Sequence, residues 1–467
     1  MAASYTDIGW EEYLVFMIVL SISIAIGIYY GCFGSKQKTT KEYLLADGKM
    51  PAFPVALSMV CSAVSAITLL ANPVEIYFYG LQFLMVILSF IPFNLSLAYL
   101  YIPVYFNLNV KSAYEFIEIR FNPLVRLVVS ILAVLHVIVS MAIAIYAPSL
   151  AIEQVTGIRT EISTAVIYFV CMFYSVLGGL KAVLWTDVFQ AFIMLASLAI
   201  IAGKGISDVG GFDIIWQRSS DHDRLGVLNF DPDPRTRHTI WTCIIAGYFF
   251  WIPSYAATQL QVQRFLSMPD MKTVKRALII NFVGLIIIVA LCFFTGLIMF
   301  AKYSDCDPLT AEEIEKSDQL VPYFVMETVD GVPGLLGLFI AGLTCASMSS
   351  LSSGLTALAS ITTYDYVSKL FPALSDTKLS LISKINTFIL GMVSYCFVFV
   401  IQNMGSILPA TSSFLGIMLG PTLGIFTLGM MVPFANAKVM YNVQTTTDET
   451  FKILDLSIYN LSGHHHF

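Results

Sequence analysis

Long, unbroken apolar segments constrain the fold of this chain more than any other feature. We count about eleven of them, each near the twenty residues that a helix needs to cross roughly 30 Å of hydrocarbon. A helix satisfies its own backbone hydrogen bonds in lipid, and the segments lack the period-two alternation of a membrane β-strand. The sequence therefore predicts an all-α polytopic membrane protein. The predicted spans are 12–33, 52–71, 81–106, 127–152, 162–180, 187–206, 239–261, 278–301, 333–363, 385–402 and 406–434.

Composition excludes several other classes of protein. Of 467 residues, 57% are hydrophobic and 12% are charged, whereas about a quarter of an ordinary soluble domain is charged. The net charge of −6 gives no basic surplus, so we expect no nucleic-acid partner. Most cysteines lie inside apolar segments and none forms a CxxC pair, so we expect no disulfide framework and no bound cofactor. No cleavable signal peptide is expected, because acidic Glu11 and Glu12 precede the first segment.

Basic residues predict the orientation in the membrane. With the N-terminus outside, 17 of the 25 lysines and arginines fall in inner loops or in the tail, and the outer loop 302–332 is acidic. An odd number of spans then puts the C-terminus in the cytoplasm. We expect a transmembrane domain over 1–437 and a polar cytoplasmic tail over 438–467.

The ninth span is unusually rich in hydroxyl groups. Ser349, Ser352, Ser353, Thr356 and Ser360 follow the spacing of one helical face. Such a face offers neutral oxygen ligands, which suit a small hard cation such as sodium. The same spacing also suits close helix packing, with each hydroxyl bonded to its own backbone. The pattern alone leaves both explanations open.

Two other spans contain polar groups or possible interruptions. The second span carries Ser58, Cys61, Ser62, Ser65 and Thr68 in an apolar stretch. A break in this span would free carbonyl groups for a cation, although no glycine or proline marks one.

The seventh span does contain a possible interruption. It lies at Pro253, within 251–255, and Gln259, Gln261 and Gln263 follow it.

Asp187 stands in the sixth apolar segment, near the predicted cytoplasmic face. A carboxylate there would attract a cation, or would simply favour the start of a helix through the dipole. The preceding Gly178-Gly179 pair predicts a turn, and His136 in the fourth span is expected to be a buried neutral packing residue.

These stretches together resemble the sodium/solute symporter family over roughly residues 10–437. The resemblance is carried by GGLKAVLWTDVFQ and by ASMSSLSSGLTALASITTYDY, which runs through Asp365. LADGKMPAFPVALSMVCSAVSAIT, NPVEIYFYGLQFL, IYAPSLAIEQVTGI and QVQRFLS are similar to the branch of monocarboxylate, multivitamin and iodide transporters. The resemblance implies a LeuT-type core of two inverted five-helix repeats, formed by spans 2–6 and 7–11, with one extra N-terminal helix. Members of the family continue with two more spans after the PFANAK-like stretch and this sequence does not, so we expect a C-terminally shortened member with a complete ten-helix core.

The resemblance also implies three binding sites. The main sodium site would use the backbone carbonyls of Cys61, Val64 and Ala346 and the hydroxyls of Ser349 and Ser350, with Ser65 beside them. A second sodium ion would lie between Asp187, Ser352 and Ser353. The substrate would lie near Thr68, Tyr146, Trp251, Tyr255 and Gln259.

The implied function is sodium-coupled import of a small organic anion at the plasma membrane, with sodium as the coupling ion. Phe90 stands where the iodide carrier has a polar glutamine, which argues against an iodide site. Ala257-Thr258 replace the usual Val-Asn before Gln259, so the identity of the substrate stays open. No lysine or arginine is predicted at mid-membrane, so an anion would depend on the sodium ion and on helix N-termini.

The alternatives are a non-transporting sensor or partner subunit and, more remotely, a membrane enzyme. The spans show no grouping of nucleophile, base and orienting residue, so we expect no enzyme. The sequence leaves the oligomeric state open.

Overall fold

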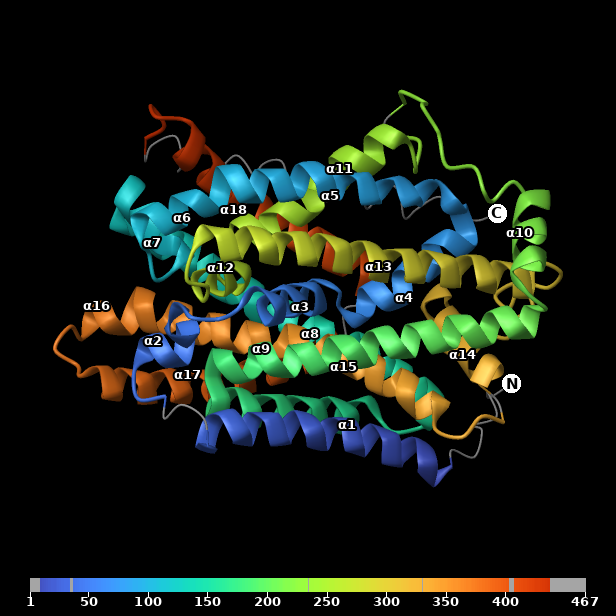
Figure 1. Ribbon diagram of the computed structural model, residues 1–467, viewed down its shortest axis with the longest axis horizontal. Helices are drawn as coiled ribbons and strands as arrows, with labels where there is room; N and C mark the ends of the chain where they lie inside the picture. Colours follow the sequence, from blue (N-terminus) through green and yellow to red (C-terminus); the bar gives the residue numbers. More distant parts are fainter. Residues whose placement is uncertain (1–8, 34–36, 234, 330, 403–406, 437–467) are drawn as a thin grey trace.

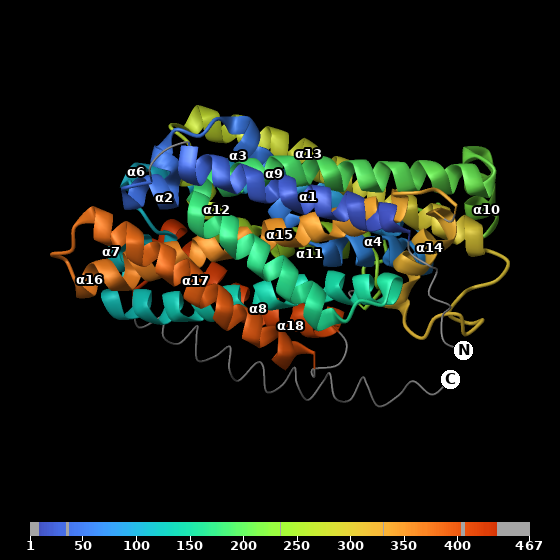
Figure 2. The same cartoon turned by 90° about the horizontal axis from the view of Figure 1, so that it is seen from below.

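The computed structural model describes residues 9–33, 37–233, 235–329, 331–402 and 407–436. Every regular element in this part of the chain is a helix, which confirms the all-α prediction. Figures 1 and 2 show the long helices lying along one common axis, with short helices near both ends. The predicted tail at 438–467 lies outside the described residues.

The helices of the first half form the predicted spans 1–6, and α2, η2 and α7 lie between these spans. They are α1 (Trp10–Ile28), η1 (Tyr29–Phe33), α2 (Thr40–Leu45), η2 (Ala46–Gly48), α3 (Ala52–Ala63), α4 (Ala66–Tyr79), η3 (Leu81–Met85), α5 (Val86–Ser96), η4 (Leu97–Tyr101), α6 (Ile102–Leu108), α7 (Ala113–Arg120), α8 (Pro123–Thr156) and α9 (Thr160–Val209).

The second half contains the remaining spans and three short connecting helices. Its elements are α10 (Phe212–Asp221), α11 (Ile240–Ala256), α12 (Gln259–Leu266), α13 (Met271–Tyr303), η5 (Ser317–Gln319), α14 (Leu320–Val329), α15 (Leu335–Ile361), η6 (Thr362–Val367), α16 (Ser368–Leu370), α17 (Asp376–Ile401) and α18 (Ile407–Met431).

Seven helices of the described chain are long and apolar enough to cross a membrane, or up to nine if each bent pair counts as one span. One of the seven, α9, contains two predicted spans. It has 50 residues, and at 1.5 Å per residue this is about 75 Å of helix, more than twice the hydrocarbon thickness. The helix is interrupted at Gly179, where φ is 57° and ψ is −160°. A Cβ atom at this position would lie 2.6 Å from the Tyr43 ring, so only glycine fits the predicted turn.

The second span is broken, as a cation site requires. Helix α3 ends at Ala63, Val64 has φ −93° and ψ 87°, and Ser65 is extended before α4 begins. A helix end leaves the carbonyl groups of its last turn without the amide partners of a continuous helix. Helix α4 then continues to Tyr79 through Pro73, so the span is longer than the predicted 52–71.

The seventh span is also broken, but not at the proline. Pro253 lies inside α11, and the chain leaves the helix at Ala257 and Thr258. Helices α11 and α12 are bent by 61° relative to each other. A proline perturbs mainly the turn that precedes it, which explains why the helix continues for three residues after Pro253.

Helix α15 is the central element of the molecule. The most apolar window of its span is 89% buried, and α15 contacts α1, α3, α8, α9 and α17. Because lipid offers no partner for a hydroxyl, this burial puts the serine-rich face against protein rather than against the bilayer.

Candidate functional site

The serine-rich face of α15 lies against the break in the second span. Ser350 Oγ lies 3.3 Å from the carbonyl oxygen of Ser62 and 3.2 Å from that of Ala346, and it can donate to either. The end of α3 and the middle of α15 are therefore in contact, as the sodium prediction requires. Cys61, Val64 and Ala346 are fully buried on these same segments.

The hydroxyl groups on this face of α15 differ in their partners. Ser352 and Ser353 donate to the carbonyl oxygen of Ser349 at 3.2 and 2.6 Å, and Thr356 donates to that of Ser353 at 3.0 Å. The Ser349 hydroxyl is buried and has no hydrogen-bond partner within the described residues. A buried hydroxyl without a partner costs free energy unless something binds it. Most of the face therefore bonds to its own helix, whereas the Ser349 hydroxyl does not.

Asp187 is fully buried on α9, and an arginine lies beside it. Arg264 Nη2 lies 3.4 Å from Asp187 Oδ2, and the side chains of the two residues are 1% and 0% exposed. Ser58 donates to the same carboxylate oxygen at 2.5 Å, and Arg264 Nη2 also bonds to Ser353 Oγ. Charge counting puts Arg264 in a cytoplasmic loop, where an arginine is usually solvated. In the structure Arg264 lies on α12, after the break at Ala257 and Thr258, and it is buried inside the protein.

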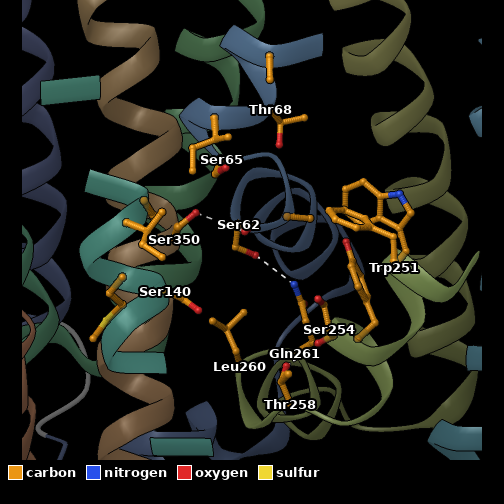
Figure 3. A pocket seen from close by; sticks show the side chains of 18 of the residues that line it. Ser62, Ser65, Thr68, Ser140, Trp251, Ser254, Thr258, Leu260, Gln261 and Ser350 are labelled. Atoms are coloured by element: carbon orange, nitrogen blue, oxygen red, sulfur yellow. Dashed lines mark hydrogen bonds between the residues drawn. The ribbon is translucent and has the colours of Figure 1, made fainter. Parts of the chain in front are cut away.

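A cavity of about 400 Å³ adjoins the break in the second span. Figure 3 shows polar side chains from several elements around it: Ser62 from the end of α3, Ser65 from the break, Ser140 from α8, Ser254 from α11, Thr258 at the start of α12, and Gln261 from α12. Gln261 Nε2 donates to Ser62 Oγ at 3.2 Å, and its buried Oε1 has no hydrogen-bond partner among the described residues. The cavity therefore offers hydroxyl groups, and the unpartnered amide oxygen of Gln261 is buried beside it.

Three of the five predicted substrate residues line this cavity, namely Thr68, Trp251 and Tyr255. Tyr146 and Gln259 are not among its lining residues. Gln259 Oε1 accepts from the Ala113 amide at 2.7 Å, and Nε2 donates to Ser360 Oγ at 2.8 Å, so this side chain ties α12 to α7 and α15.

Gln261 is the functional candidate that the sequence analysis did not select. Positions 259 and 261 lie about 200° apart around a helix, so only one of the two can face the cavity. The spacing of the glutamines in the sequence shows that only one of them can face the cavity. The rotation of α12 about its axis decides that this residue is Gln261.

A model of the Sodium:solute symporter family matches residues 43–439 of the chain. The chain belongs to this family. It is therefore a multi-pass sodium-coupled solute symporter, and membership gives no support to the sensor alternative.

Curated relatives of this symporter are transporters as well. It is 40% identical to sodium-coupled monocarboxylate transporter 1 of Homo sapiens over 432 residues, which cover 92% of this chain and 71% of the relative. It is 38% identical to a putative sodium-dependent multivitamin transporter of Drosophila melanogaster, with 92% of this chain and 72% of that one covered. These relatives support the prediction of a transporter rather than an enzyme.

The fold of the symporter also has a solved counterpart. A Na⁺-coupled sialic acid symporter, in a substrate-bound outward-open state, superposes with a TM-score of 0.83 at 27% identity, covering 92% of this chain and 89% of that one. A nucleobase-cation-symport-1 family transporter shares the fold with a TM-score of 0.52 at 14% identity. The predicted LeuT-type fold is confirmed.

A second buried ion pair lies near the predicted cytoplasmic end of the symporter, between α8 and η6. Arg126 Nε on α8 donates to Asp365 Oδ1 on η6 at 3.1 Å, and Ser112 donates to Asp365 Oδ2 at 3.0 Å. Arg126 also pairs with Glu118 of α7, as does Lys369. The Lys369 hydrogen bond and the Arg126 guanidinium hold the pKa of Glu118 below its ordinary value. The cluster therefore joins the consecutive helices α7 and α8 to η6 and α16, which lie more than 200 residues later in the chain.

Proposed function

We propose that this symporter imports a small organic anion, a monocarboxylate or a vitamin-like carboxylate, across the plasma membrane together with sodium. The N-terminus would lie outside and the C-terminus in the cytoplasm. The observation that carries the proposal is the contact between the α15 hydroxyl groups and the broken second span, next to a polar cavity. The names of the curated relatives support the substrate class.

The main sodium ion would bind between α3 and α15. Its ligands would be the carbonyl oxygens of Cys61, Val64 and Ala346 and the hydroxyls of Ser349 and Ser350. Five neutral oxygens from a helix end and a helix face suit a hard monovalent cation. Ser65 and Ser350 line the cavity as well, so ion and substrate would be close neighbours.

The cavity suits an anion that arrives together with a cation. None of its described lining residues is a lysine or an arginine, so the bound sodium would supply the positive charge. The only carboxylate of that lining, Glu75, is neutralised by Arg237, which bonds to it at 2.7 and 3.0 Å. The volume of about 400 Å³ falls within the range of roughly 300–1,000 Å³ for drug-sized ligands, so it accommodates a vitamin as well as a monocarboxylate.

Sodium binding would order the break, complete the substrate site and favour rocking of one helix bundle against the other. A tenfold sodium gradient supplies about 1.4 kcal/mol, and each charge that crosses about 60 mV adds roughly as much.

Sodium-dependent uptake is the direct test of this function. In proteoliposomes with an inward sodium gradient, we expect at least one of lactate, pyruvate, biotin and pantothenate to enter about tenfold faster than with choline in place of sodium. Equal rates in sodium and choline for all four carboxylates would contradict the proposal. Uptake of iodide alone would contradict the assignment of an organic anion.

Replacing Gln261 with leucine tests the substrate site. The change removes the free amide oxygen and the bond to Ser62, so we expect KM for the substrate to rise about tenfold while sodium dependence is kept. Gln259→Leu is the matched control, because Gln259 bonds outside the cavity. It is expected to lower the amount of folded protein and to leave KM unchanged. A raised KM in Gln259→Leu alone would return the substrate role to Gln259.

A further inference from the structure

Arg264 joins four helices at one buried point. From α12, its Nε donates to Ser58 Oγ of α3 at 2.8 Å, and its Nη2 bonds to Ser353 Oγ of α15 and lies 3.4 Å from Asp187 Oδ2 of α9. Its Nη1 donates to the carbonyl oxygen of Leu260 at 2.8 Å. Helix α3 is one half of the broken second span, and α12 is one half of the broken seventh span. A single guanidinium therefore links both of these half-helices to α9 and α15.

The ion pair leaves two buried oxygens unused. Within the described part of the chain, Asp187 Oδ1 and Ser349 Oγ have no partner at hydrogen-bond distance, although the two side chains lie near enough to interact weakly with each other. An arginine and a carboxylate pair most strongly through two parallel hydrogen bonds, and here the guanidinium reaches only one carboxylate oxygen. A free, buried carboxylate oxygen is a ligand that a small hard cation prefers, whereas the Ser349 hydroxyl is already a proposed ligand of the main sodium ion.

The same place was predicted to hold a second sodium ion between Asp187, Ser352 and Ser353. With Arg264 in position, the positive charge of the guanidinium balances that of Asp187. A sodium ion added to this pair would leave a net positive charge away from water, which is costly in a low-dielectric interior. Sodium and the guanidinium cannot both be stable partners of one carboxylate there.

We propose that Arg264 is a tethered cation that competes with sodium for the site formed by Asp187 and Ser353. While Arg264 occupies the site, it holds the inner halves α3 and α12 against α9 and α15. Sodium in the second site displaces the guanidinium and releases α12, so the inner side opens only after that ion has bound. This inference rests on the proposed sodium coupling and deepens it, because it names the residue that couples the ion to opening.

Replacing Arg264 with lysine tests the competition. Lysine keeps the charge but loses the planar fork that reaches Ser58, Asp187 and Ser353 together. A weaker competitor should lower the sodium concentration for half-maximal uptake at least about threefold. Arg126→Lys is the matched control, since Arg126 is also a buried arginine paired with an aspartate. It should leave the sodium response unchanged even where it lowers the amount of protein.

A second measurement does not depend on transport. In the wild-type protein, sodium should increase hydrogen exchange of the backbone amides of 259–266, because α12 is released. In the neutral pair Asp187→Asn with Arg264→Gln, which leaves no buried charge unpaired, this sodium effect should vanish.

Two results would overturn the inference. One is a half-maximal sodium concentration for uptake that differs by less than twofold between wild type and Arg264→Lys. The other is a sodium effect on hydrogen exchange in α12 that survives in the neutral pair. A wild type that transports equally well in choline would instead overturn the proposed function.

Discussion

Ser349→Ala is expected to raise the sodium concentration needed for half-maximal uptake by about tenfold to a hundredfold. The hydroxyl is buried and has no partner at hydrogen-bond distance among the described residues, so its removal loses only a weaker interaction with Cys61 and Asp187. It does remove one of five proposed ion ligands. A hydrogen-bond-like contact to a charged group contributes about 1.5–3 kcal/mol, which is the source of the expected factor.

The control for this variant is Ser347→Ala on the same helix. Ser347 is equally buried, and its hydroxyl also has no partner within the described chain, but it lies about 200° away around α15. Its removal should leave the sodium response unchanged. If both variants respond to sodium like the wild type, Ser349 is not a ligand of the coupling ion. Ser350→Ala is less informative, because it also breaks the contact with the Ser62 carbonyl.

Arg126→Ala is expected to reduce the free energy of unfolding by about 3–5 kcal/mol, the usual cost of removing one partner of a buried ion pair. The substitution leaves the Asp365 carboxylate, which is 1% exposed, without its guanidinium. The expected measurement is a clear fall in the thermal midpoint of the detergent-purified protein, together with less protein at the cell surface.

Two further variants make this result specific. The neutral pair Arg126→Gln with Asp365→Asn should recover much of the lost stability, because no buried charge then stays unpaired. Lys204→Ala removes a more exposed pair with Asp208 on α9 and should cost no more than about 0.5 kcal/mol. Equal midpoints for Arg126→Ala and Lys204→Ala would contradict a stabilising role of the buried cluster.

The family motifs pointed to helices that meet at the cavity, but not every side chain they singled out lines it. They put Ser349 and Ser350 opposite the break in the second span, and the contact between Ser350 and Ser62 agrees with that arrangement. They also gave Gln259 a substrate role, although Gln261 is the glutamine that lines the cavity. The difference comes from the break at Ala257, which resets the rotation of the following helix.

Charged residues were the least predictable part of the site. Charge counting assigned Arg264 and Arg126 to cytoplasmic loops, because an arginine near the end of an apolar segment is usually solvated. In the folded chain both are buried against aspartates. Each pairing joins residues at least 77 positions apart, which no local pattern could reveal.

The sequence by itself determined that the chain crosses a membrane many times, which segments do so, and which span concentrates hydroxyl groups. These properties follow from the fixed thickness of the bilayer and from the cost of polar groups in lipid, and both act on each segment separately. Only the tertiary structure decided where the helices break, which glutamine faces the cavity and which cation meets Asp187. Those features depend on the rotation and packing of several helices at once, because a buried polar atom is stable only where a neighbouring helix supplies its partner.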